Sequence, residues 1–118
     1  MPGAKIVIQV MSGPDDGQRI YLSQDDGDGD TALDGTWSVV IGRKEKCDVS
    51  IPFDTQVSRE HAILRLTPEH EFWLMDAGSM NGTFIERQRV LQPALVERGQ
   101  LFRLGRTWLR IEPEAGEK

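Results

Sequence analysis

The sequence predicts an all-β fold, a β-sandwich of two antiparallel-rich sheets with about 10–11 short strands. Short apolar runs rich in β-branched residues recur along the chain, and Gly, Pro, Asn and Asp separate them. No segment keeps the apolar period of an amphipathic helix. The 118 residues fit one domain spanning 1–118, and no repeat of solenoid length is present.

The N-terminal part of the chain is typical of a hairpin. Residues 5–11 predict a strand because Ile6, Val7 and Ile8 are β-formers. The turn residues of 12–17 and the alternating pattern of 18–22 complete the hairpin. Residues 23–35 are rich in Gly and Asp, and we expect a mobile loop there because they offer little apolar surface to bury.

A calcium site is the alternative interpretation of that loop. Asp26, Asp28 and Asp30 fall at the first, third and fifth positions of a calcium-loop pattern. The pattern then fails, since Thr31 stands where the turn needs Gly and Trp37 where a bidentate Glu belongs. We therefore favour a solvated acidic loop and expect no metal site and no cofactor.

The rest of the chain alternates further strands with turns. Apolar runs bounded by turn residues predict strands at 36–41, 47–51, 61–66, 72–75, 83–85, 100–104 and 107–111. Residues 90–99 contain Pro93 and predict a turn-like stretch with room for half a turn of helix. The core therefore covers about 6–112, and we expect the charged tail 113–118 to be disordered.

Charge and cysteine content narrow the function classes. The net charge of −5 disfavours nucleic acid, although six Arg and two Glu between residues 86 and 110 leave a locally basic region. The single Cys47 excludes an intrachain disulfide, and a small apolar strand residue is favoured over a nucleophile. No apolar run approaches the ~20 residues of a membrane span, so we expect a cytoplasmic protein without membrane contact.

Three motifs follow apolar strands, at the positions where a β scaffold carries function. They are Gly42-Arg43, Ser58-Arg59-Glu60-His61 and Ser79-Met80-Asn81-Gly82-Thr83. An Arg fork, a Ser hydroxyl and an Asn amide together supply hydrogen-bond donors suited to a phosphate.

The ordered motifs G-R, S-R-x-H and S-x-N-G-T resemble the forkhead-associated (FHA) domain, a β-sandwich that binds phosphothreonine. The resemblance covers about 6–112, and all three motifs in order are a specific signal. It implies that Arg43 and Ser58 bind the phosphate and that Arg59 and Asn81 bind the peptide. It also implies structural roles for Gly42, His61 and Gly82.

The sequence departs from the family pattern at two positions. Met80 stands where the family usually has a Ser or Thr that helps bind phosphate, and a thioether cannot donate a hydrogen bond. Either that contact is missing and Met80 lies against the peptide, or Ser79 replaces it through a loop shift. Glu86 stands where the family often has a loop-organising Asn, so we expect a changed turn there.

The arginines after that turn have two open interpretations. Arg87 and Arg89 extend a basic rim for acidic residues of a partner, or they belong to a solvated face. The sequence favours neither.

The predicted function is a non-catalytic, monomeric adaptor that recognises phosphothreonine in a protein partner. The alternative is an FHA-like domain that binds a partner or itself without phosphate, which Met80 and Glu86 favour. A Cys or His hydrolase lacks a recognisable nucleophile–base pair, and His61 has only His70 as a companion for a metal.

Overall fold

The computed structural model describes residues 3–113, which are all-β. The predicted disordered tail, apart from Pro113, lies outside the described residues. Twelve strands occur within them: β1 (Lys5–Val10), β2 (Arg19–Ser23), β3 (Asp30–Thr31), β4 (Trp37–Gly42), β5 (Val49–Ser50), β6 (Ala62–Leu66), β7 (Phe72–Asp76), β8 (Thr83–Ile85), β9 (Gln88–Arg89), β10 (Ala94–Val96), β11 (Phe102–Leu104) and β12 (Thr107–Ile111). Within residues 3–113, no helix is long and apolar enough to cross a membrane.

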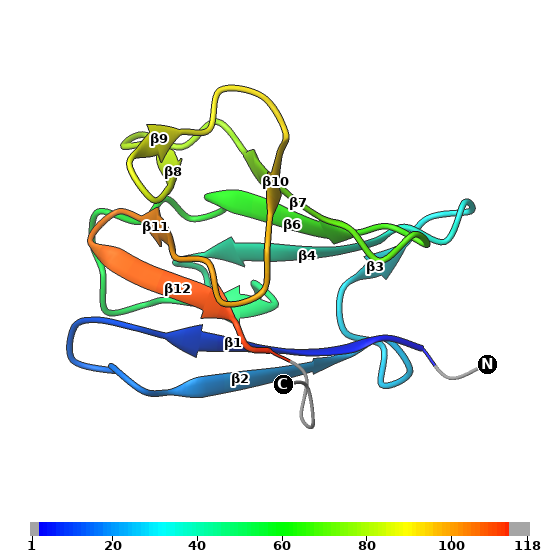
Figure 1. Ribbon diagram of the computed structural model, residues 1–118. Helices are drawn as coiled ribbons and strands as arrows, with labels where there is room; N and C mark the ends of the chain where they lie inside the picture. The colour runs from blue at the N-terminus through cyan, green and yellow to red at the C-terminus, as the bar shows by residue number, and fades with distance from the viewer. Residues whose placement is uncertain (1–2, 114–118) are drawn as a thin grey trace.

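The strands form two sheets, as the sequence predicts (Figure 1). One has the order β2-β1-β12-β11-β8-β9, and the other has the order β10-β7-β6-β4-β3 with β5 added beside β4. Every pairing is antiparallel except β4 with β5, which run parallel from Ile41 opposite Val49. The sandwich class is therefore confirmed.

The core lies between the two sheets because apolar residues alternate along the strands. In β1, Ile6, Ile8 and Val10 are buried and the residues between them are partly exposed. Fully burying one such side chain stabilises the fold by about 1.5–3 kcal/mol. Trp37 of β4 contributes the largest fully buried side chain from the facing sheet.

Residues 90–99 hold a strand rather than the half-turn of helix that the sequence allowed. Strand β10 pairs antiparallel with β7, with Ala94 opposite Leu74 and Val96 opposite Phe72. Pro93 immediately precedes the strand, where its missing N–H costs no ladder bond.

The strand predicted at 47–51 is shorter in the structure, where β5 spans Val49–Ser50. The N–H of Cys47 instead closes a turn by donating to Lys44 O.

Several specific hydrogen bonds contact the acidic loop 23–35, which the sequence predicts to be mobile. The backbone N–H of Ser23 donates to the Asp28 carboxylate at 2.9 Å. Trp37 Nε1 donates to Asp28 O at 2.7 Å, and Gly29 N–H donates to the Asp48 carboxylate at 3.1 Å. The contacts of this loop are therefore mainly polar.

The calcium pattern gains no support from the positions of its carboxylates. Within residues 3–113, no group of three or more His, Cys, Asp or Glu side chains is placed to hold a metal ion. Asp28 already accepts a backbone bond from Ser23, and Asp30 lies in β3.

Candidate functional site

Three loops meet at one end of the sandwich (Figure 1). These recognition loops are residues 43–48 after β4, residues 51–61 before β6, and residues 77–82 after β7. Arg43 N–H donates to Ser58 O at 2.9 Å, and Asn81 Nδ2 donates to Gln56 O at 2.9 Å. The structure therefore brings together residues from all three sequence motifs.

Gly42 permits the closest of these loop contacts. A Cβ atom at this position would lie 2.2 Å from Arg59 O and 3.0 Å from Cys47 Sγ. Real side chains do not tolerate such distances, so only glycine lets the two loops approach this closely. This geometry fits the structural role that the resemblance implies for Gly42.

Arg43 is fixed at its Nε atom and open at its end. Its Nε donates to Val57 O at 3.0 Å, which holds the stem of an otherwise exposed side chain. Its two terminal nitrogens have no hydrogen-bond partner within residues 3–113. The outer edge of the guanidinium is therefore available to a ligand with paired acceptor oxygens.

His61 is fully buried and bonds to two loops through its two ring nitrogens. Nδ1 accepts the N–H of Ser58 at 2.9 Å, so Nδ1 carries no proton. The proton then sits on Nε2, which lies 2.9 Å from Gly82 O and donates to it. The neutral ring thus joins loop 51–61 to loop 77–82, consistent with the implied structural role.

Gly82 has a backbone geometry that favours glycine. Its φ angle of +89° lies in the left-handed region, which other residues adopt only with strain. Its carbonyl accepts from His61, and its N–H donates to Ser79 Oγ at 2.9 Å. Both backbone groups of Gly82 are therefore used to fix the loop.

Asp76 organises loop 77–82 from the end of β7. Its carboxylate accepts from Ser79 Oγ at 2.5 Å, from Thr83 Oγ1 at 2.7 Å, and from the N–H groups of Gly78 and Ser79 at 3.0 Å each. Burial alone would raise the pKa of this carboxyl. The hydrogen bonds from Ser79, Thr83 and Gly78 outweigh it and hold the pKa below its ordinary value.

The prediction that Ser79 replaces Met80 as a phosphate donor does not fit this geometry. A hydroxyl has one proton, and Ser79 donates it to Asp76. The N–H of Ser79 also donates to Asp76. Ser79 therefore shapes the loop, and both of its donors are committed.

Met80, Asn81 and Arg59 present their side chains outward. The Met80 side chain is 85% exposed, although its backbone N–H donates to Ser58 Oγ at 2.9 Å. Because Ser58 Oγ accepts from Met80, its own proton remains available to a ligand. The Asn81 amide oxygen and the Arg59 guanidinium likewise have no partner within residues 3–113.

Asp54 is a site residue that sequence reasoning missed. This buried carboxylate accepts from the N–H groups of Gln56 at 2.9 Å and Arg106 at 2.8 Å, and from Thr107 Oγ1 at 2.7 Å. Burial raises the pKa of the Asp54 carboxyl, but these hydrogen bonds lower it by more. The pKa therefore lies below its ordinary value. The usable signal is local: Asp54 and Asp76 each bond the N–H two residues later, as turn-forming Asp residues do.

Glu86 adopts an unfavourable backbone conformation in the β8–β9 hairpin. Ile85 pairs with Gln88, so Glu86 and Arg87 form a two-residue turn. The φ angle of Glu86 is +53°, a region that Asn and Gly occupy more easily than Glu. The sequence analysis predicts a changed turn at Glu86, and in the structure the Glu86 backbone is locally strained.

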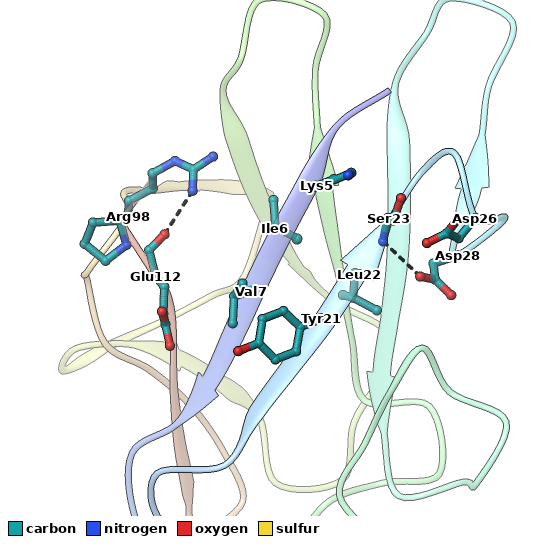
Figure 2. A pocket seen from close by; sticks show the side chains of 11 residues that line it. Lys5, Ile6, Val7, Tyr21, Leu22, Ser23, Asp26, Asp28, Arg98 and Glu112 are labelled. Carbon is teal, nitrogen blue, oxygen red and sulfur yellow. Dashed lines mark hydrogen bonds between the residues drawn. The ribbon is translucent and has the colours of Figure 1, made fainter. Parts of the chain in front are cut away.

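A separate hollow of about 390 Å³ lies over β1 and β2 (Figure 2). Lys5, Val7 and Tyr21 line it together with Arg98 and Glu112. No residue of the recognition loops contributes to it. Acidic, basic and apolar groups are mixed in its lining, so its chemistry does not point to a phosphate.

Residues 39–105 match the FHA domain family model. A two-sheet sandwich with these loops is the FHA-type fold, and the chain belongs to the FHA domain family.

Two curated relatives are about one-third identical to the chain over the aligned residues. The oxoglutarate dehydrogenase inhibitor of Corynebacterium glutamicum is 32% identical over 88 residues, covering 75% of this chain and 52% of the relative. The glycogen accumulation regulator GarA of Mycobacterium tuberculosis is 32% identical over 105 residues, covering 89% and 55%. The chain therefore spans about half the length of these relatives.

Two solved structures share the fold along nearly the whole chain. One, from a study of phosphothreonine-dependent FHA domain interactions, has a TM-score of 0.71 and 26% identity, covering 94% of this chain and 98% of that one. The FhaA FHA domain complexed with the intracellular domain of Rv3910 has a TM-score of 0.68 and 27% identity, covering 91% and 99%.

Proposed function

We propose that this FHA domain is a non-catalytic module that binds phosphothreonine in a protein partner. The observation that carries the proposal is the pairing of Arg43 with Ser58. Arg43 is fixed by Val57 and Ser58, yet its terminal nitrogens are open. Ser58 is fixed by His61 and Met80, yet its hydroxyl proton is open.

The binding mechanism follows from these open donors. A phosphothreonine is close to dianionic at neutral pH and offers three acceptor oxygens. Arg43 would engage two of them with its planar fork, and Ser58 would donate to another. Arg59 would add positive charge, and the Asn81 amide oxygen would accept an N–H of the peptide backbone. Because the loops are already fixed, little ordering entropy opposes binding.

Two features support a module without catalysis. Burial raises the pKa of the Cys47 thiol, which donates to Arg59 O at 3.2 Å, so the thiolate form is disfavoured. Both ring nitrogens of His61 are occupied by backbone groups. Neither residue is placed to act as a nucleophile or as its base.

A regulatory role in the cytoplasm is the broader part of the proposal. The relatives are an inhibitor of oxoglutarate dehydrogenase and a regulator of glycogen accumulation, which are both control proteins rather than enzymes by name. A chain with one free thiol is compatible with a reducing compartment. We propose that the domain acts there as a monomer on a threonine-phosphorylated protein.

Calorimetric titration with a degenerate phosphothreonine peptide library tests the proposal. The expected result is binding of the phosphothreonine library alone, with phosphoserine and unphosphorylated libraries as controls. Arg43→Ala should abolish it, whereas Arg65→Ala, at an exposed arginine of β6, should not. Binding that persists without phosphate would instead support the phosphate-independent alternative, which the exposed Met80 side chain favours.

A further inference from the structure

We propose that the outer face of the β2-β1-β12-β11-β8-β9 sheet binds an acidic segment of the same partner that carries the phosphothreonine. This inference rests on the proposed function and extends the recognition site onto the sheet. The surface concerned, called here the arginine face, consists of Arg19, Phe84, Arg89, Arg103, Trp108 and Arg110.

Strand register places four of these residues in one row. Arg89 of β9 lies opposite Phe84 of β8, which lies opposite Arg103 of β11, which lies opposite Trp108 of β12. Residues directly opposite one another in an antiparallel sheet share a face. Cations and aromatic rings therefore alternate across four strands.

This row faces solvent. The residues flanking it in β8 and β11 are buried and point into the core: Thr83, Ile85, Phe102 and Leu104. Successive side chains of a strand point to opposite faces, so Phe84 and Arg103 point outward.

Arg103 is a preordered cation at the centre of the row. Its Cζ atom lies 4.3 Å from the centroid of the Phe84 ring and 5.6 Å from that of Trp108. Its Nη1 donates to Gly105 O at 2.6 Å. The two rings and one carbonyl already restrict the rotamers of Arg103 in the unbound protein. A carboxylate that binds Arg103 therefore costs little additional side-chain entropy.

Arg89 connects the row to the recognition loops. Its guanidinium atoms lie 3.0–3.2 Å from the point that a Cβ would occupy at Gly82. Gly82 follows Asn81, which we propose binds the backbone of the peptide. Arg89 is exposed and has no hydrogen-bond or ion-pair partner within residues 3–113. A peptide leaving Asn81 in this direction would therefore meet an uncompensated positive charge first.

A second row lies beside the first. Arg110 is opposite Gln9, to which its Nε donates at 3.0 Å, and Gln9 is opposite Arg19. Within the described residues, Arg19 alone of the four arginines has an ion-pair partner, Glu112, at 2.6 Å. The face is therefore basic in a protein whose net charge is −5.

An acidic peptide segment is the occupant that fits this charge and its position. Arg89 and Arg103 are two strands apart, which is about 10 Å at the usual spacing and about three residues of an extended peptide. Carboxylates a few residues from the phosphothreonine would reach both. Nucleic acid fits less well because seven Asp between residues 15 and 34 make the chain acidic overall.

The test compares matched phosphopeptides on the intact chain. One phosphothreonine peptide carries a short block of Asp after the phosphothreonine, a second carries the block before it, and their controls carry Asn instead. Titrations use the wild type, Arg89→Gln, Arg103→Gln and Arg65→Gln. Arg65 lies exposed on the other sheet and matches the charge change.

We expect that one of the two Asp peptides will bind about five- to tenfold more tightly than its Asn control, because two or three exposed ion pairs together contribute a gain of that size. This gain should fall below about twofold in Arg89→Gln and Arg103→Gln, remain in Arg65→Gln, and shrink as added salt screens it.

Four results would overturn the inference. Equal binding of Asp and Asn peptides, or a gain that survives both arginine variants, would reject the arginine face and leave the proposed function intact. Loss of binding for every phosphopeptide would reject both. Tighter binding of a single-stranded oligonucleotide than of the Asp peptide, lost in the same two variants, would identify a nucleic-acid surface instead.

Discussion

The backbone N–H of Met80 donates to the hydroxyl oxygen of Ser58 at 2.9 Å, while the Met80 side chain is 85% exposed. The main chain at this position thus orients the proposed phosphate-binding hydroxyl, whichever side chain the position carries. A residue that cannot donate through its side chain can still take part in building the site.

Replacing Met80 by Thr should strengthen phosphothreonine binding. The backbone bond to Ser58 is kept, and a new hydroxyl would face the ligand. One hydrogen bond to a charged group contributes about 1.5–3 kcal/mol, so titration should show at least a tenfold lower Kd. Met80→Ala is the control, with a change below about threefold. An unchanged Kd for the Thr variant would place the phosphate out of reach of this position.

His61→Ala should destabilise the fold strongly. The substitution removes two hydrogen bonds and leaves a cavity at a fully buried position. We expect a loss of about 2–4 kcal/mol in the free energy of unfolding, measured by urea denaturation. His70→Asn, at an exposed turn position with a φ of 69°, should stay within about 0.5 kcal/mol of the wild type. If His61→Ala also lowered the free energy of unfolding by no more than about 0.5 kcal/mol, that result would contradict the bridging role of the ring.

The carboxylates of Asp54 and Asp76 should make the fold sensitive to acid. Each has a folded-state pKa below the ordinary value of 3.8, so the folded protein binds fewer protons than the unfolded chain. Their contribution is complete above the unfolded pKa and is lost as pH falls through the folded pKa.

Urea denaturation between about pH 3 and pH 6 measures this dependence. Stability should rise with pH in the lower part of that range and then level off. In Asp76→Asn and Asp54→Asn the rise should be shallower. Asp15→Asn, in the exposed first turn, is the control and should keep the wild-type slope. A rise of equal steepness in all four proteins would contradict the assignment.

Glu86→Gly should stabilise the protein. The φ of +53° is strained for Glu and relaxed for Gly, and the backbone N–H keeps its bond to Leu101 O. The gain should be about 0.5–1 kcal/mol, reduced by the extra freedom that Gly gives the unfolded chain. Glu86→Asn should give a smaller gain. Glu86→Ala should give none, because Ala has the same backbone strain, and a similar gain from Ala would point to charge instead.

The longer strands and the sandwich class could be predicted because their apolar patterns are strong. The two-residue strands β3 and β9 are exposed throughout and carry no such pattern. Strand β10 was not predicted, because Pro93 directly precedes it and favours a turn. The strand forms by pairing with β7, and a single sequence does not reveal which strands pair.

The sequence motifs suffice to propose which residues form the candidate site, but they do not predict the hydrogen bonds between those residues. The motifs identified Arg43, Ser58 and Asn81, which the loops bring together. The commitment of Ser79 to Asp76 depends on a loop conformation, since several acceptors compete for one hydroxyl proton. The same holds for Asp54, whose partners Arg106 and Thr107 lie more than 50 residues along the chain.

The bonds of Asp54 have a consequence for how variants of this domain should be interpreted. Its carboxylate holds the N–H of Gln56, and the carbonyl of Gln56 holds the side chain of Asn81. The same carboxylate is anchored by Thr107 in the opposite sheet. Three consecutive hydrogen bonds therefore connect Thr107 to Asn81, the proposed peptide contact, so we expect a substitution at Thr107 to alter the position of Asn81. We therefore expect that a mutational screen limited to exposed loop residues would miss buried residues, such as Thr107, whose substitution weakens binding.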